Sequence, residues 1–292
     1  MEKTIIIAEI GECYNGDLGI AKRLIFEAKN AGCDIAKFQT LDYENIADDD
    51  PEREWFQKIA MTPEKISILM GYGKDIGIEI LFTPENLKTA IWLKECGLNA
   101  VKIASSTLNN HELLFYAKNN FRKIFVSTGM ASLDEVNNVV SIFEGVNDFY
   151  LMHCISEYPT GPLLESRGLC ALDVRDVRLN MMKMLIYLYP SIKIGYSDHT
   201  SGILAPVAAV AMGAKVVEKH ITLDRSTPIK NFLSKKEYLG TDHVLSIEPH
   251  ELRDMVKQIR EVEKMFGKWV WERSEGEKIL KNFLRERFCG EK

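Results

Sequence analysis

Residues 193–222 read KIGYSDHTSGILAPVAAVAMGAKVVEKHIT, and the rest of the chain can be interpreted around them. Two short apolar runs each end in a polar cluster, SDH at 197–199 and EKH at 218–220, and the segment between them is predicted to be a helix. If both runs are parallel strands, His199 and His220 emerge at the same edge of one sheet. Two imidazoles on one edge are what a divalent metal ion needs.

Six more apolar runs precede this stretch, and segments with helical periodicity separate most of them. We predict strands at Thr4–Glu9, Asp34–Thr40, Glu79–Thr83, Ala100–Ala104, Lys123–Ser127, Phe149–Cys154, Lys193–Ser197 and Lys215–His220. Alternating strands and helices imply parallel strands joined by right-handed crossovers. Eight such repeats favour an α/β fold, the closed TIM (β/α)8 barrel. The alternative is a doubly wound sheet, but the chain has neither a GxGxxG nor a GxxxxGK[ST] motif.

The repeats fill residues 1–267 as one domain, and residues 268–292 form a short charged tail. The tail is amphipathic, and we expect a helix that lies on the barrel; the alternative is an arm that reaches a partner chain. The acidic stretch Asp42–Glu54 is predicted to be an exposed loop. Asp17 is a predicted N-cap, and Ser132 begins a capping-box pattern.

The composition bounds the class of protein. Of the 292 residues, 46% are hydrophobic and 27% charged, which predicts a soluble globular protein. The net charge of −5 and the pI of about 5.8 give no electrostatic reason to expect a nucleic-acid partner. No apolar run approaches the ~18–20 residues of a membrane span, and no leader is apparent, so we expect a cytoplasmic protein. The six cysteines lack CxxC spacing and are expected to be reduced, with Cys154 a small buried residue.

Polar side chains stand at the predicted strand ends, where the chemistry of a (β/α)8 barrel takes place. They are Glu9, Lys37, Gln39, Thr83, Lys102, Ser105, Ser127, the stretch 153–158 with Ser156 and Tyr158, and Ser197. A lysine is rarely buried without a partner, so Lys37 and Lys102 predict an anion site. With three hydroxyls nearby, they favour a phosphate-bearing ligand. The alternative is that each lysine pairs with a carboxylate of the protein and the hydroxyls pack.

The histidines favour a metal site because they form a pair on adjacent strands. Glu9 and Asp242 are candidates for further oxygen ligands of an ion held by His199 and His220. No sulfur ligand is obviously placed, so Mn, Mg and Zn all fit the residues. His153 on the sixth strand is either a core histidine or part of the site, and the sequence leaves both alternatives open.

Eight motifs in a fixed order carry a resemblance to a known family. They are AEIG with NGD, KFQT, KIAS, STGMAS, HCISEYP, GYSDHT, EKHITLD and GTDHVLSIEP. In this order they resemble the sialic acid (N-acetylneuraminate) synthases, which are phosphoenolpyruvate-dependent aldol synthases, over residues 4 to about 267. The resemblance implies a TIM-barrel transferase of carbohydrate biosynthesis. It would condense phosphoenolpyruvate with an open-chain N-acetylated amino sugar, N-acetylmannosamine or a related sugar, to give a nonulosonic acid and phosphate.

The resemblance also implies a role for each matching residue. It makes Glu9, Lys37 and Gln39 catalytic, and it makes His199 and His220 the ligands of a divalent metal, Mn or Mg. The residues that it implies for binding phosphoenolpyruvate and the sugar are Thr83, Lys102, Ser105, Ser127, Ser156, Tyr158, Ser197 and Asp242. It further implies a homodimer.

The chain departs from the family pattern on the sugar side of the site. Cys13-Tyr14 stands where the family usually has Asn-His, and Ser106-Thr107 stands where it usually has Gly and an acidic residue. The printed sequence ends in a stretch that resembles only the connector to the C-terminal antifreeze-like domain common in the family. We therefore expect synthase chemistry on a related amino sugar, bacillosamine- or pseudaminate-like. The alternatives are a non-catalytic or regulatory barrel that binds phosphoenolpyruvate or a sugar without turnover, and a metal-dependent hydrolase or lyase.

Overall fold

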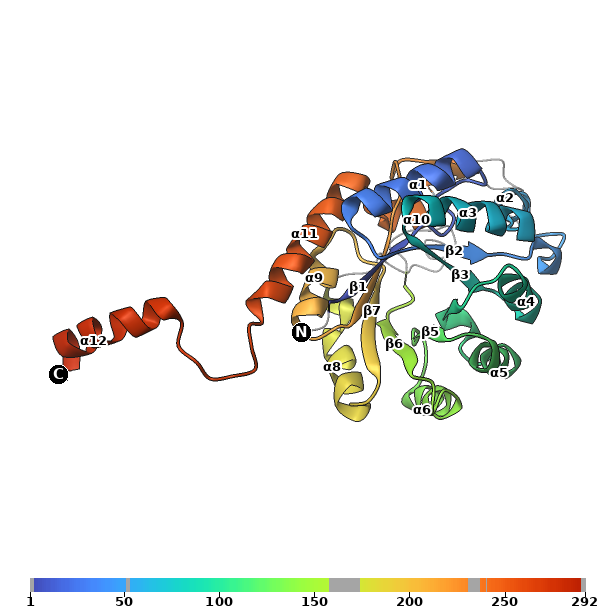
Figure 1. Ribbon diagram of the computed structural model, residues 1–292. Helices are drawn as coiled ribbons and strands as arrows, with labels where there is room; N and C mark the ends of the chain where they lie inside the picture. The colour runs from blue at the N-terminus through green and yellow to red at the C-terminus, as the bar shows by residue number, and fades with distance from the viewer. Residues whose placement is uncertain (1–2, 51–52, 158–173, 231–236, 240, 290–292) are drawn as a thin grey trace.

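Eight parallel strands form the centre of the computed structural model, which describes residues 3–50, 53–157, 174–230, 237–239 and 241–289 (Figure 1). They are β1 (Ile5–Glu9), β2 (Ile35–Thr40), β3 (Glu79–Pro84), β4 (Ala100–Ile103), β5 (Lys123–Ser127), β6 (Asp148–Cys154), β7 (Lys193–Asp198) and β8 (Val216–His220). Hydrogen-bonded neighbours follow in the order β3-β2-β1-β8-β7-β6-β5-β4, and β3 also lies against β4. The sheet is therefore a nearly closed barrel, and the predicted TIM fold is confirmed.

Helices surround the barrel and join successive strands (Figure 1). They are α1 (Leu18–Ala31), α2 (Arg53–Ile59), α3 (Pro63–Ile76), α4 (Leu87–Glu95), α5 (His111–Asn120), α6 (Leu133–Ile142), α8 (Leu179–Leu188), α9 (Leu204–Ala211), α10 (Thr241–Leu245), α11 (Pro249–Met265) and α12 (Glu275–Cys289). The predicted caps are confirmed. The Asp17 carboxylate accepts hydrogen bonds from the backbone N–H groups of Gly19 and Ile20, and Ser132 forms a capping box with Glu135.

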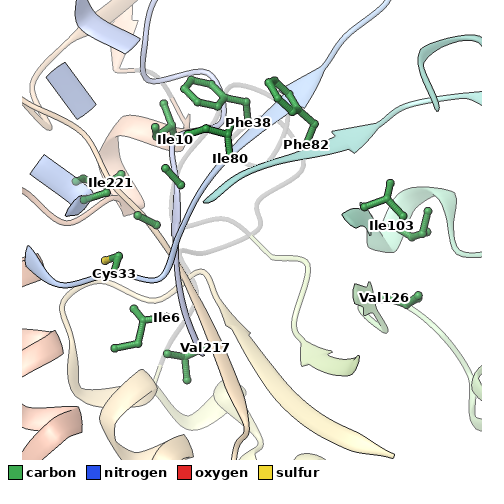
Figure 2. Close-up of a cluster of buried hydrophobic side chains, with 14 of the residues drawn as sticks. Ile6, Ile10, Cys33, Phe38, Ile80, Phe82, Ile103, Val126, Val217 and Ile221 are labelled. Atoms are coloured by element: carbon green, nitrogen blue, oxygen red, sulfur yellow. The ribbon is translucent and has the colours of Figure 1, made fainter. Parts of the chain in front are cut away.

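Side chains alternate along each strand between the helices and the barrel interior. Figure 2 shows outward-facing side chains, among them Ile6, Phe38 and Phe82, and the two phenyl rings stack with centroids 5.7 Å apart. The inward-facing side chains nearer the strand starts form a separate apolar core, made of Ile7, Ile35, Leu81, Ala100, Phe125, Tyr150, Met152 and Val216. This inner core fills the barrel interior. Inward-facing polar side chains further along the same strands therefore lie above it, at the end of the barrel where the strands have their carboxyl ends.

The barrel interior has no space for a side chain at Gly195 on β7. A Cβ atom there would lie 2.7 Å from the carbonyl oxygen of Val216 on β8 and would also collide with the Cγ1 atom of that valine. Gly195 thus lets β7 and β8 approach each other closely. Two positions further along, Ser197 and Glu218 are direct partners in the same parallel ladder.

Part of the predicted exposed loop at 42–54 is regular structure, and that prediction is wrong there. A 3-10 turn, η1 (Tyr43–Asn45), lies within it, and α2 begins at its end, at Arg53. The indole of Trp55 is buried, and its N–H donates to Glu12 Oε2 at 2.8 Å. Trp55 and the buried Ile59, whose carbonyl oxygen accepts from the Tyr14 hydroxyl, anchor the helix to the turn after β1, and the acidic composition did not reveal these contacts.

The segment after β8 returns to the mouth of the barrel. It contains a small antiparallel hairpin of β9 (Pro228–Lys230) and β10 (Glu237–Leu239), and α10 then carries Asp242. Helix α11 packs against α1 and α9 on the outside of the barrel. Asp242 therefore reaches the site from helix α10, in the segment that follows β8, rather than from a strand.

The C-terminal helix α12 stands apart from the barrel at the end of an extended segment (Figure 1). Trp269 and Trp271 in that segment are completely exposed, and Ile279 and Phe288 of α12 are each about three-quarters exposed. The expectation that the tail lies on the barrel is therefore wrong. Within the described ranges, we find no helix long and apolar enough to cross a membrane.

Candidate active site

The pairing of three neighbouring strands brings Glu9, Lys37 and His220 to one level of the barrel. Glu9 at the end of β1 lies opposite Lys37 of β2 and opposite His220 of β8 in the two parallel ladders. Ile7 and Ile35, two positions earlier on β1 and β2, belong to the inner core, so Glu9 and Lys37 also face inward. A carboxylate, an ammonium group and an imidazole therefore stand side by side above the apolar core.

A cavity of about 210 Å³ opens at this end of the barrel. Most of the predicted site residues line it, namely Glu9, Lys37, Gln39, Thr83, Lys102, Ser105, Ser127, Ser156, Ser197, His199 and His220. Asp242 lies beside them, with its Oδ2 atom 3.7 Å from Nδ1 of His220. Tyr158 lies outside the described residues. Side chains from all eight strand ends thus meet around one cavity.

Both buried lysines pair with carboxylates of the protein. The Lys37 ammonium forms an ion pair with Glu9 and donates a 3.0 Å hydrogen bond to Thr83 Oγ1. The Lys102 ammonium contacts both carboxylate oxygens of Glu218, at 3.1 and 3.2 Å, and Glu218 also lies 3.8 Å from Lys37 Nζ. The alternative of lysine–carboxylate pairing is therefore observed, yet both ammonium groups also line the cavity. An entering anion would meet two positive charges that already share two carboxylates.

The electrostatics of the two carboxylates differ. Burial raises the pKa of Glu9, and the nearby charge of Glu218 adds to this effect although Lys37 opposes it. Burial would also raise the pKa of Glu218, but the charges of Lys102 and Lys37 outweigh it and lower that pKa. Glu218 is therefore the firmly ionised member of the cluster, and Glu9 is the carboxyl group that holds a proton more readily.

The hydroxyl groups that line the cavity differ in whether they form hydrogen bonds with other groups of the protein. Ser197 Oγ donates to Glu218 at 3.0 Å, and Ser105 Oγ accepts from the backbone N–H of Gly129 at 3.0 Å. Ser127 Oγ is buried and has no hydrogen-bond partner among the described residues. A buried polar group without a partner is costly, so this hydroxyl is well suited to bind a ligand.

The two histidines face each other across the β7–β8 edge, with ring centroids 5.5 Å apart. His199 Nδ1 donates to the carbonyl oxygen of Ile155 at 2.9 Å, which orients the ring. His220 Nδ1 is buried, with no hydrogen-bond partner within the described ranges. Burial, with the charges of His199 and nearby lysines, holds the pKa of His220 well below its usual value, so the ring is a neutral donor.

The donor set fits a divalent cation in part. Two imidazoles converge, one with an orphaned nitrogen, and a carboxylate oxygen of Asp242 lies close to the second ring. Among the residues that the structure describes, no three His, Cys, Asp or Glu side chains come together as a ready-made metal site. An ion would therefore take its remaining ligands from substrate and water, as catalytic sites do.

Sequence reasoning missed the charged cavity residue Glu218 and left the role of His153 undecided. Glu218 lies two positions before His220 on β8, so strand alternation alone would have placed it on the same inner face. Cys154 is buried as predicted and also lines the cavity. His153 does not line it: the ring contacts the Val177 carbonyl oxygen at 2.9 Å and stacks on Tyr196, so it is a core histidine.

The fold and the polar cavity at the strand ends define a (β/α)8-barrel enzyme. The NeuB family model matches residues 24–271, and the chain belongs to the NeuB family. A Methanocaldococcus jannaschii protein of uncharacterised function is 40% identical over 269 residues, which are 91% of this chain and 73% of that protein. The N,N'-diacetyllegionaminic acid synthase of Campylobacter jejuni is 33% identical over 311 residues, 100% of this chain and 86% of that enzyme.

Solved structures agree with this assignment. The crystal structure of N-acetylneuraminic acid (sialic acid) synthetase from Leptospira borgpetersenii has a TM-score of 0.82 and 30% sequence identity, and the match covers 100% of this chain and 94% of that chain. The resemblance to sialic acid synthases seen in the sequence is therefore confirmed. The chain is an enzyme of the nonulosonic acid synthase type, a class of transferases that form a carbon–carbon bond.

Proposed function

We propose that this enzyme condenses phosphoenolpyruvate with an open-chain N-acetylated amino sugar, N-acetylmannosamine or a related sugar, to give a nonulosonic acid and phosphate. The observation that carries the proposal is the cavity in which Lys37 and Lys102 meet the unpartnered hydroxyl of Ser127. Two ammonium groups and several hydroxyls in one small buried cavity suit a ligand that bears both a phosphate and a carboxylate.

The phosphoenolpyruvate side of the site would use groups from several strands. Lys102, with Ser105 and Ser127, would bind one anionic group of the substrate, and Lys37 with Thr83 would bind the other. The two ammonium groups already pair with Glu9 and Glu218. An incoming anion would contact the same ammonium groups alongside these carboxylates. Ser156 and Ser197 complete the hydroxyl lining. This arrangement would hold the substrate by its phosphate and its carboxylate and leave the C3 methylene group, which forms the new bond, to face the acceptor.

A divalent cation, Mn or Mg, belongs to the proposal, and His199 and His220 would hold it. The orphaned Nδ1 of His220 and the oriented ring of His199 are the observations that support it. When bound, the ion would act as a Lewis acid on the aldehyde of the sugar. Metal binding requires unprotonated rings, so it would release any proton held by His199.

The chain's own residues would then order the reactants. The C3 carbon of phosphoenolpyruvate forms a bond to the aldehyde carbon of the sugar, and the carbonyl π bond opens so that the aldehyde oxygen becomes a hydroxyl. Water adds to C2 and gives up the proton that this hydroxyl requires. The bond from C2 to the bridging oxygen then breaks, phosphate leaves with that oxygen, and C2 becomes a ketone. Glu9 would orient that water, because its carboxylate lies at the level of Lys37 and His220. Gln39 Nε2 lies 3.4 Å from Glu9 Oε1 and would help to fix this carboxylate.

The acceptor sugar would lie at the mouth of the cavity near Asp242 and Tyr158. Cys13 and Tyr14 do not line the cavity, and Tyr14 donates its hydroxyl to the carbonyl oxygen of Ile59 instead. Ser106 lines the cavity. The Cys13-Tyr14 pair therefore supports the barrel wall, and Ser106 is the departure from the family pattern that supports the proposal of a related, bacillosamine- or pseudaminate-like acceptor.

Two further parts of the proposal concern the assembly and its location. We place the barrel at residues 1–267 with 268–292 as a tail, and we propose a homodimer in which the detached α12 reaches the second copy. The exposed Trp269 and Trp271 support this, because apolar side chains of that size rarely stay in water. A cytoplasmic location agrees with the free thiols of Cys13, Cys33 and Cys154.

A coupled assay tests the proposed reaction. The purified protein is incubated with Mn²⁺, phosphoenolpyruvate and a panel of open-chain 2-acetamido sugars, and released phosphate is measured. We expect phosphate release that depends on one class of sugar. Tight binding of phosphoenolpyruvate in calorimetry without release for any sugar would favour the non-catalytic alternative. Absence of both binding and release would contradict the proposal.

A further inference from the structure

A buried ion pair lies behind the two histidines, on the face of β7 and β8 that points away from the cavity. Asp198 Oδ2 and Lys219 Nζ are 2.7 Å apart, and both side chains are completely buried. The two residues are direct partners in the β7–β8 ladder. Asp198 immediately precedes His199 in the chain, and Lys219 immediately precedes His220. The ion pair therefore links the backbone of one histidine to that of the other.

The pair also holds the chain on the far side of His199. Asp198 accepts hydrogen bonds from the backbone N–H of Thr200 at 3.2 Å and from its hydroxyl at 2.9 Å. Lys219 Nζ donates a second hydrogen bond, to the carbonyl oxygen of Thr200. Tyr196 adds its hydroxyl, which donates to Asp198 Oδ1 at 2.6 Å. Residues 196, 198 and 200 are thus fastened to one carboxylate and to β8, and His199 lies between them.

Stability alone does not explain such a pair. Two charges lose their hydration when they are buried, and well-packed uncharged replacements are often as stable or more stable. Its value lies instead in geometry, since it dictates the path of the backbone on both sides of His199. The ring of His199 is held separately, through Nδ1, by the Ile155 carbonyl oxygen. Ligands of a metal need such backing to keep their relative positions.

We propose that Asp198 and Lys219 are positioning residues that hold His199 and His220 in the relative orientation required to bind a divalent cation. The inference rests on the proposed metal site. It predicts that removal of both charges uncouples the two rings without unfolding the barrel. It also predicts that the loss appears in metal affinity, which is measurable without any turnover.

The test uses a double variant in which Asp198→Asn and Lys219→Met remove both charges and keep the approximate shapes. Asparagine retains an acceptor for Tyr196 and Thr200, and methionine fills the space of the lysine. Mn²⁺ affinity is measured by electron paramagnetic resonance, and folding by thermal unfolding. We expect an unchanged fold and a Kd for Mn²⁺ about 10–100-fold higher. The control is Asp148→Asn with Lys193→Met, a partly exposed 2.8 Å pair at the opposite end of β6 and β7, and it should leave the Kd unchanged.

Each outcome separates the positioning role from the metal site itself. A double variant that binds Mn²⁺ as tightly as the parent overturns the positioning role and leaves the metal site intact. A parent protein that does not bind Mn²⁺, or a His220→Ala variant that binds it equally well, overturns the metal site and the inference with it. If the double variant does not fold, Tyr196→Phe removes one anchor of Asp198 without a charge. It should weaken Mn²⁺ binding by a smaller factor, and unchanged binding would contradict the inference.

Discussion

Replacing Glu218 by glutamine tests how the cavity manages its charges. The carboxylate lies 3.1 and 3.2 Å from Lys102 Nζ, 3.0 Å from Ser197 Oγ and 3.8 Å from Lys37 Nζ. Glu218→Gln keeps the size of the side chain and an acceptor for Ser197. It removes the negative charge that both lysines face. The change therefore isolates the electrostatic part of the interaction.

The expected magnitudes follow from the burial of the pair. Loss of one partner from a buried ion pair costs about 3–5 kcal/mol, because the Lys102 ammonium stays buried without its counter-charge. We expect the free energy of unfolding without ligand to fall by about that amount. An anion that enters the cavity then supplies the missing charge. If it recovers only a third of the loss, about 1.4 kcal/mol, phosphate binds about tenfold more tightly than in the parent.

Urea unfolding with and without inorganic phosphate measures the first effect, and isothermal titration calorimetry with phosphate measures the second. The control is Glu79→Gln, which removes a carboxylate that pairs with Lys123 at 2.9 Å at the opposite end of the barrel. That pair is partly exposed, so its loss should cost less than about 1 kcal/mol and leave phosphate binding unchanged. Phosphate binding to Glu218→Gln that is equal to or weaker than parental binding would refute the reasoning.

Three further predictions concern the histidines and the barrel interior. His220→Ala should abolish Mn²⁺ binding and turnover, because its orphaned Nδ1 is the buried donor, while circular dichroism stays unchanged; retained metal-dependent turnover would exclude a two-histidine site. Gly195→Ala should lower the free energy of unfolding by about 1–3 kcal/mol, since its Cβ would lie 2.7 Å from the Val216 carbonyl oxygen, and an unshifted urea midpoint would contradict this. Burial lowers the pKa of His153 below 6.5, although its hydrogen bond to Val177 opposes this, so the unfolded chain binds a proton first as the pH falls. Stability should therefore decline below about pH 6.5, by at most about 1.4 kcal/mol per pH unit from this group, and His153→Gln should remove that part of the slope in urea titrations; identical slopes would count against it.

The strands could be predicted because their apolar runs are short, β-branched and bounded by turns. Glu9 and Lys37 also followed from the sequence, since alternation along a buried strand places a charged residue either inside the barrel or under the helices. Strands β1 and β2 each begin one residue later than predicted and end at the predicted residue. Most of the residues that line the cavity can therefore be predicted from side-chain alternation along the strands and from the positions of the strand ends.

Other features depend on contacts between residues that are far apart in the sequence, and the sequence pattern does not predict these contacts. Lys102 on β4 pairs with Glu218 on β8, two strands that stand on opposite sides of the barrel, and their side chains meet across its interior only because the sheet closes. The helix that carries Trp55 is held by contacts with the turn after β1, from Trp55 to Glu12 and from Tyr14 to the carbonyl oxygen of Ile59. The amphipathic tail shows that α12 needs an apolar partner, but amphipathicity alone does not say whether that partner is its own barrel.

A crystal structure of the enzyme soaked with phosphoenolpyruvate and Mn²⁺ tests the central claim most directly. We expect density for the ligand in the cavity, with its phosphate and carboxylate on the Lys37 and Lys102 sides and the Ser127 hydroxyl hydrogen-bonded to it. We also expect one ion, identified by its anomalous signal, on His199 and His220. Phosphoenolpyruvate bound elsewhere, or a metal that ignores both histidines while the ligand occupies the cavity, would contradict it.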